Sequence, residues 1–240
     1  MDDEKEDALM ILQIEMTNNC NLDCVYCPRP ELSRSKKCMD FYVFSAILNS
    51  FIKDTSEITT VVLSKDGEPL LHPQFKEFVF ELTSMYKGKI DIYTNGVFLT
   101  SDIIDFLGSL SNEMHLLITE HWHGRDKTQM QECVKTRANA VMAVEKKYKN
   151  IKIHLTLHSI DCRFEDAERD WQLFWESQKN THSNIVNIAV NKKINPWIGF
   201  INIGEVTVFE KCPFVSYPFI CFGVTGNALV CCIDLNEELC

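Results

Sequence analysis

The chain has 240 residues, of which 45% are hydrophobic, and a formal net charge of −10. This length allows one large domain with a sizeable core and a small appendage. A negative charge disfavours a nucleic-acid partner, because phosphate contacts require a basic face. No apolar stretch approaches the roughly 20 residues that cross a bilayer, so we expect no membrane partner either.

The cellular location of the protein bears on the role of its cysteines. The first seven residues carry five acidic side chains, and the apolar run that follows is short. This is unlike a signal peptide, so we predict a cytoplasmic protein. The chain has 11 cysteines. Without an export signal, they are better explained as metal or redox ligands than as a disulfide framework.

Short runs rich in Val, Ile and Leu alternate with segments of helical period, which is the pattern of βα units around a parallel sheet. We predict strands over residues 10–16, 59–64, 89–93, 115–119, 151–158 and 185–190. We predict helices over residues 40–53, 73–87, 101–109, 128–149 and 165–179. The predicted fold class is therefore α/β, a partial (βα)6 TIM-like barrel.

Reactive residues of such a barrel lie in the loops that follow the strands. Each of the first five predicted strands is followed by a polar motif. In chain order these are the cysteine loop, residues 66–69, residues 94–96, residues 120–122 and residues 158–159. All five motifs are expected on one face of the barrel.

The pattern changes near Trp197 to short strands with turn signals. Thr225, Gly226 and Asn227 lie between apolar runs and predict a β-hairpin. We therefore predict two parts: a barrel over residues 1–196 and a small cysteine-bearing hairpin extension over residues 197–240.

The barrel's first loop carries Cys20, Cys24 and Cys27 at C-x3-C-x2-C spacing. Three thiolates can bind three irons of a [4Fe–4S] cube and leave the fourth iron open to another ligand. A zinc site normally needs a fourth ligand, such as Cys38, and an electron-transfer cluster normally has four cysteines. We favour the open-iron interpretation over these two alternatives.

This loop, with aromatic Tyr26 before the last cysteine, resembles the cluster loop of the radical S-adenosylmethionine (radical SAM) superfamily. The segment Asp66-Gly67-Glu68-Pro69 is similar to that family's Gly-Gly-Glu-Pro loop, with Asp66 in place of the first glycine. The resemblance implies that the open iron of a [4Fe–4S] cluster binds SAM. It also implies SAM contacts from these residues: Tyr26, Gly67, Glu68, Pro69, Asn95 and Glu120.

In the family, the reduced cluster cleaves SAM to methionine and a 5′-deoxyadenosyl radical, which takes a hydrogen atom from the substrate. The resemblance therefore implies an electron donor such as flavodoxin or ferredoxin. Few catalytic side chains are needed, because the cofactor supplies the chemistry. His158 and Lys193 are our candidates for a general base or a substrate contact, and His121 for a wall of the pocket.

The C-terminal cysteines resemble the SPASM or shorter Twitch extension of radical SAM enzymes, which holds an auxiliary [4Fe–4S] cluster. Cys212 and Cys231 match its first two ligands best. The usual later C-x2-C pair is missing. Three alternatives remain: Cys221 and Cys240 complete the cube, one iron stays open, or the extension is truncated and empty.

Residues 67–71, 92–100 and 118–121 and the hairpin leading into Cys231 resemble, within the superfamily, the 2-deoxy-scyllo-inosamine dehydrogenases. This similarity implies a radical SAM oxidoreductase that dehydrogenates a carbohydrate-like or aminocyclitol alcohol. The alternatives are epimerisation, modification of a peptide, or a non-catalytic iron–sulfur or zinc-binding module.

Overall fold

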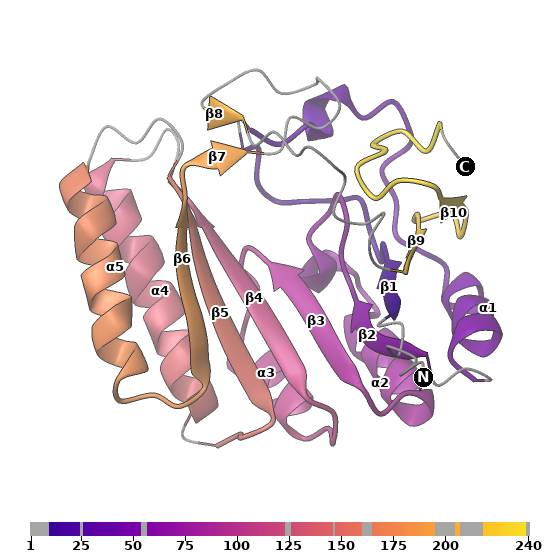
Figure 1. Ribbon diagram of the computed structural model, residues 1–240, viewed down its shortest axis with the longest axis horizontal. Coiled ribbons are helices and arrows are strands. Elements are labelled where there is room, and N and C mark those ends of the chain that lie inside the picture. Colours follow the sequence, from indigo (N-terminus) through magenta and orange to yellow (C-terminus); the bar gives the residue numbers. More distant parts are fainter. Residues whose placement is uncertain are drawn as a thin grey trace, which may run out of the picture.

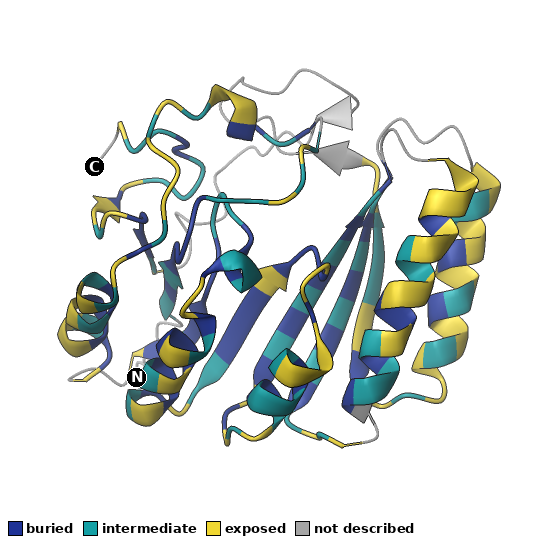
Figure 2. Ribbon diagram, turned by 180° about the vertical axis from the view of Figure 1, so that it is seen from behind, coloured by how far each residue is buried: buried dark blue, intermediate teal, exposed yellow. Residues whose placement is uncertain are grey.

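The structure is a computed structural model that describes residues 10–24, 26–53, 57–122, 126–145, 147–159, 165–194, 205–206 and 218–238. Its centre is an eight-stranded sheet in the order β10-β9-β1-β2-β3-β4-β5-β6 (Figure 1). Helices cover one face of this sheet (Figure 2). In the described part of the chain, no helix is long and apolar enough to cross a membrane.

The strands of the barrel are β1 (Met10–Ile14), β2 (Ile58–Val62), β3 (Lys89–Thr94), β4 (Met114–His121), β5 (Ile151–His158) and β6 (Ile185–Asn191). The helices are α1 (Phe41–Phe51), α2 (Phe75–Met85), α3 (Ser101–Gly108), α4 (Lys127–Glu145) and α5 (Glu165–Lys179). Two 3-10 helices, η1 (Arg29–Glu31) and η2 (Pro69–Leu71), follow β1 and β2.

Strands β1 to β6 pair in parallel and in chain order, which confirms the predicted partial barrel. Their carboxyl ends therefore meet at one edge of the sheet, at the top of Figure 1. Along β4 and β5, buried residues alternate with partly exposed ones. Because neighbouring side chains of a strand point to opposite faces, each strand contributes one row to the helix-covered core and one row to the barrel interior.

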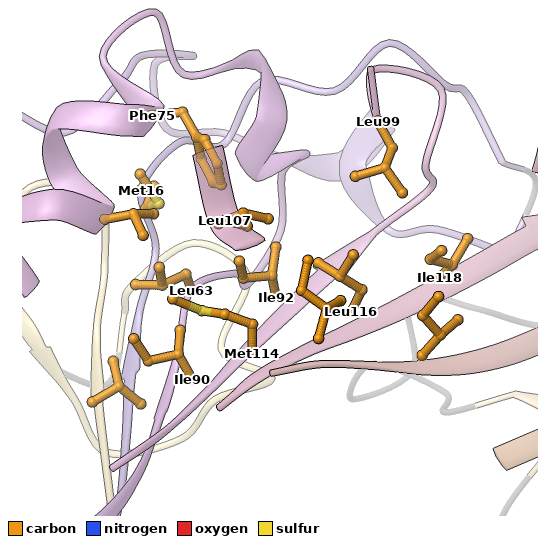
Figure 3. Packing of buried hydrophobic residues seen from close by; sticks show 14 of the residues in the cluster. Met16, Leu63, Phe75, Ile90, Ile92, Leu99, Leu107, Met114, Leu116 and Ile118 are labelled. Atoms are coloured by element: carbon orange, nitrogen blue, oxygen red, sulfur yellow. The ribbon is translucent and has the colours of Figure 1, made fainter. Parts of the chain in front are cut away.

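The core lies between the sheet and its helices. Ile90 and Ile92 of β3 and Leu116 and Ile118 of β4 are fully buried. Figure 3 shows them near Phe75, Leu99 and Leu107, which come from the helices and loops on that side. Burying such side chains is the main stabilising contribution to the fold, at roughly 25 cal/mol per Å² of apolar surface.

Local signals fix where the helices begin. Asp40 caps α1 by accepting a hydrogen bond from the Tyr42 N–H, and Thr100 caps α3 by accepting one from the Ile103 N–H. Each cap satisfies a backbone donor that the first helical turn would otherwise leave unpaired. Both helices therefore start within one residue of the predicted position.

The predicted hairpin is present as β9 (Phe219–Phe222) and β10 (Ala228–Leu229), which pair antiparallel. Gly226 adopts a φ of 86° in its turn, a conformation that glycine reaches without strain. Strand β9 also pairs in parallel with β1, so the hairpin extends the barrel sheet. The short strands β7 (Lys193–Ile194) and β8 (Glu205–Val206) pair with each other.

Two phenylalanines on α2 give a matched test of the core. Phe78 is fully buried, with its ring centroid 4.5 Å from that of Phe44, whereas Phe80 is 64% exposed. We expect Phe78→Ala to lower the free energy of unfolding by about 3–5 kcal/mol, since it leaves a cavity. Phe80→Ala should change it by less than about 1 kcal/mol. Urea unfolding of both variants measures this, and equal losses would contradict the described packing.

Candidate functional site

A cavity of about 410 Å³ opens at the carboxyl edge of the sheet. This volume falls in the usual range of small-molecule sites. Side chains and backbone from all five predicted motif regions line it: Cys20, Cys24, Tyr26, Cys27, Arg29, Lys65, Asp66, Gly67, Glu68, Tyr93, Thr94, Asn95, Thr119, His121, His158 and Asn191 are among the lining residues. The structure thus brings most of the predicted site residues together.

The three cysteines of the first loop all contribute to this cavity. The Cys27 N–H donates to the Cys24 carbonyl at 2.9 Å, which closes the last turn of the loop. Among the described residues, no three Cys, His, Asp or Glu side chains converge as ligands of a single metal ion. Cysteines of an iron–sulfur cube each bind a different iron, so such convergence is not required of them.

Cys38, the fourth ligand in the zinc alternative, is not among the residues that line the cavity. Its thiol lies 3.5 Å from the Thr17 hydroxyl oxygen, to which it donates. The cavity arrangement therefore favours the cluster interpretation of the triplet over a four-cysteine zinc site.

The loop after β2 packs directly on the cysteine loop at Gly67. A Cβ on this glycine would lie 2.1 Å from the Thr17 carbonyl oxygen and 2.6 Å from that of Asn19. The next residue strengthens the contact, because the Glu68 N–H donates to the Asn19 carbonyl at 2.7 Å. Only glycine allows this approach of the two backbones.

Glu68 lines the cavity, and its carboxylate joins its own loop to the end of β3. It is 3% exposed and accepts hydrogen bonds from the Leu70 N–H, the Thr94 hydroxyl and the Asn95 N–H. Burial raises the pKa of Glu68, and these hydrogen bonds act in the opposite direction. Pro69 is buried in η2 and supports this loop without lining the cavity.

Asn95 is fixed on several sides at the end of β3. Its side-chain amide donates to the Asn21 side chain at 2.9 Å and its side-chain oxygen accepts from the Val97 N–H. Arg137 of α4 is 5% exposed and donates to the Asn95 carbonyl. Arg137 was not predicted from the sequence, since an arginine within a helix carries no signal of a distant loop contact.

Three rings form one wall of the cavity. The Tyr26 hydroxyl is hydrogen-bonded to Nδ1 of His121, and its ring stacks on that of His158 at 5.3 Å. His121 and His158 stack at 5.5 Å. Burial lowers the pKa of His158 to about 4, so its imidazole is neutral near pH 7. Within the described part of the chain, the buried Nδ1 of His158 has no hydrogen-bond partner.

The structure does not place Glu120 in the cavity. This residue is 2% exposed and accepts a hydrogen bond from the Trp122 indole on the helix-covered face of β4. Its neighbours Thr119 and His121 point the other way and line the cavity. The prediction of a SAM contact from Glu120 is therefore corrected by the alternation of the strand.

The residue that replaces the family's first glycine joins a buried ionic cluster. Asp66 pairs with Lys65 and with Arg34, and Arg34 also binds Glu15 and Glu237 at 2.6 Å and 2.7 Å. Burial raises the pKa of Asp66 to about 6. The cluster ties the loop after β2 to the segment that follows the C-terminal hairpin. Its members could not be grouped from the sequence, because they come from distant segments.

The remaining predicted residues lie apart from the cavity or beyond the described residues. Cys221 is fully buried on β9, and burial raises its pKa, while Cys231 is partly exposed just beyond β10. Cys212 and Cys240 lie outside the described residues, as does the side chain of Lys193. Lys192 pairs with Glu168 at 2.9 Å.

Comparison with known proteins is consistent with this site. The family model described as Radical SAM superfamily matches residues 14–119, from the end of β1 into β4. The resemblance that the motifs indicated is thereby confirmed for this stretch, which holds the cysteine, Gly67 and Asn95 loops. This family implies SAM and a [4Fe–4S] cluster.

One curated relative is the tungsten-containing aldehyde ferredoxin oxidoreductase cofactor-modifying protein of Pyrococcus furiosus. It is 31% identical over 104 residues, which cover 43% of this chain and 28% of that protein. The chain thus matches less than a third of the relative's length.

Two solved structures share the fold. BtrN, solved with AdoMet and 2-DOIA, has 19% identity and a TM-score of 0.58, covering 96% of this chain and 76% of BtrN. SuiB from Streptococcus suis, solved with its precursor peptide SuiA, has 12% identity and a TM-score of 0.59, covering 97% of this chain and 61% of SuiB. At these identities the likeness concerns the fold alone.

The neutral, buried His158 predicts a pH-dependent stability. Its native pKa of about 4 lies below the ordinary histidine value of 6.5, so the unfolded chain binds the proton first as the pH falls. His158 should therefore have no effect above about pH 6.5 and destabilise the fold progressively towards pH 4. Between pH 7.5 and 5, we expect the wild type to lose about 2 kcal/mol more than His158→Asn. Urea unfolding of the metal-free proteins measures the difference, and identical losses would contradict the described burial.

Proposed function

We propose that this chain is a radical SAM oxidoreductase whose catalytic centre is the cavity at the carboxyl edge of the sheet. The observation that supports this most is the meeting of Cys20, Cys24 and Cys27 with Gly67 and Asn95 around one cavity. The match of residues 14–119 to the superfamily model supports the same chemistry.

In this proposal the three thiolates hold the [4Fe–4S] cluster, and Gly67, Glu68, Asn95 and Tyr26 hold SAM. When bound, this pair supplies a reductively generated radical that abstracts a hydrogen atom from the substrate. The protein's own residues would bind the cluster and SAM and orient them. The Gly67 backbone fixes the distance between two loops, Glu68 holds the Asn95 loop, and the Tyr26 ring forms an apolar wall.

The substrate we propose first is a carbohydrate or aminocyclitol alcohol, which would be dehydrogenated with the loss of two electrons. The fold shared with BtrN, solved with 2-DOIA, supports this choice. A peptide is the second candidate, because SuiB, solved with its precursor peptide, shares the fold to a similar extent. The electron donor would be a small redox protein of the flavodoxin or ferredoxin kind.

Oxidation of an alcohol also releases a proton, so a base is required. His158 is our candidate, because its neutral imidazole lines the cavity at the end of β5. Lys193, which begins β7 shortly after the end of β6, is the second candidate. Both assignments are proposals.

The second electron of a dehydrogenation needs an acceptor, and we propose an auxiliary [4Fe–4S] cluster for this role. Its ligands would be Cys212, Cys231, Cys221 and Cys240. The hairpin β9–β10 supports the proposal, since it holds Cys221 and ends just before Cys231. Buried Cys221 needs a deprotonating partner such as a metal to act as a thiolate, given its raised pKa.

The cysteine triplet is tested by Cys20→Ala, Cys24→Ala and Cys27→Ala. After anaerobic reconstitution and reduction, each variant should form less than about 1% of the wild-type 5′-deoxyadenosine, because the open iron is lost. Chromatography of the quenched reaction measures it. A wild-type protein that holds iron and sulfide yet forms no 5′-deoxyadenosine would refute the enzymatic proposal, and zinc at full occupancy would indicate a binding module.

The auxiliary cluster is tested by the double variant Cys212→Ala/Cys231→Ala. It should lose about four irons per chain and still cleave SAM, while it forms less oxidised product. Cys133→Ala serves as a control, because Cys133 lies on α4 away from both cysteine groups. An unchanged iron content in the double variant would show that the extension holds no cluster.

A further inference from the structure

Arg29 is a buried cation in the wall of the cavity. It opens η1, two residues after the last cysteine of the loop, and only 7% of its surface is exposed. Its Nη1 donates to the Leu22 carbonyl at 2.7 Å, which anchors the guanidinium to the cysteine loop itself. Arg29 and all three cysteines line the same cavity.

The described residues give this cation no counter-ion that is equally buried. Its ion-pair partner is Asp23 at 3.8 Å, whose side chain is 96% exposed. The Arg29 Nε is buried and has no hydrogen-bond partner within the part of the chain that the structure describes. A buried charge is costly unless it is paired, so this position calls for a negative charge from another source.

The other carboxylates of the cavity already have their own partners. Asp66 is shared between Lys65 and Arg34. Glu68 accepts hydrogen bonds from Thr94 and the Asn95 backbone. Among the groups that line the cavity, the three cysteines therefore remain as a source of negative charge for Arg29, as thiolates of a bound cluster.

We propose that Arg29 is the built-in counter-charge of the cluster that Cys20, Cys24 and Cys27 would hold, and that it favours the reduced cluster. This inference rests on the proposed function. Reduction adds one electron, and hence one negative charge, from the electron donor. A fixed cation close by lowers the energy of that added charge, and the effect is large where water is excluded. Arg29 thus raises the reduction potential of the cluster.

The test is an anaerobic redox titration of the reconstituted protein with dithionite, followed by electron paramagnetic resonance and carried out without SAM. We expect Arg29→Gln to keep the wild-type iron content and to shift the reduction equilibrium at least about tenfold towards the oxidised form. For a one-electron couple this is about 59 mV. Arg29→Lys, which retains the cation, should stay close to the wild type.

Arg169→Gln is the matched control, because Arg169 lies on α5 and its side chain is 71% exposed. It removes the same charge from the protein and should leave the potential unchanged. An equal shift in Arg169→Gln and Arg29→Gln would overturn the inference, since it would reflect net charge alone.

A second source of negative charge is the carboxylate of SAM. If Arg29→Gln leaves the SAM-free potential unchanged and weakens SAM binding, the inference is overturned in favour of that pairing. If Arg29→Gln loses its iron, the reduction potential of Asp23→Asn is measured instead. Removing the exposed carboxylate that pairs with Arg29 should make the potential less negative. An unchanged or more negative potential in Asp23→Asn would then overturn the inference. A wild-type protein that assembles no cluster would refute the proposed function itself.

Discussion

The close approach of two backbones at Gly67 is the constraint on which the cavity depends. Parallel pairing of β1 with β2 brings the cysteine loop beside the loop after β2, and the missing side chain of Gly67 lets them touch. The hydrogen bond from Glu68 to Asn19 then fixes their relative position. Through its carboxylate, Glu68 carries the same constraint to the Asn95 loop. Three loops from consecutive strands are thus held as one unit.

Two arginines, Arg34 and Arg29, add ionic contacts to this unit of three loops. Arg34 binds Glu15, which directly follows β1, and Glu237, which lies beyond the hairpin, so the C-terminal segment is attached to the barrel by buried ion pairs. Such pairs are costly to break singly, because each would leave an unpaired buried charge. Arg29 differs, since its visible partner is an exposed carboxylate. Arg34 therefore joins distant segments of the chain, whereas Arg29 is positioned to bind an anion in the cavity.

The sequence allowed the fold and most of the site to be predicted, because both depend on local patterns. Alternating apolar residues located β5 to the residue, and the motifs after the strands met as a parallel barrel requires. The pairing of β9 with β1 was not predictable, since the two strands are distant in sequence and neither carries a pairing signal. The prediction of a SAM contact from Glu120 was avoidable. Glu120 shares its strand face with Leu116 and Ile118, and their alternation with polar residues already indicated that this face lies in the core.

The proposed chemistry requires that the three cysteines leave one iron of the cluster open to SAM. Electron–nuclear double resonance of the reduced cluster with SAM labelled by ¹⁷O in its carboxylate and ¹⁵N in its amino group tests this most directly. We expect hyperfine coupling of both labels to the cluster, because SAM chelates the open iron through these two groups. A cluster that forms and binds SAM with neither coupling would contradict this binding mode.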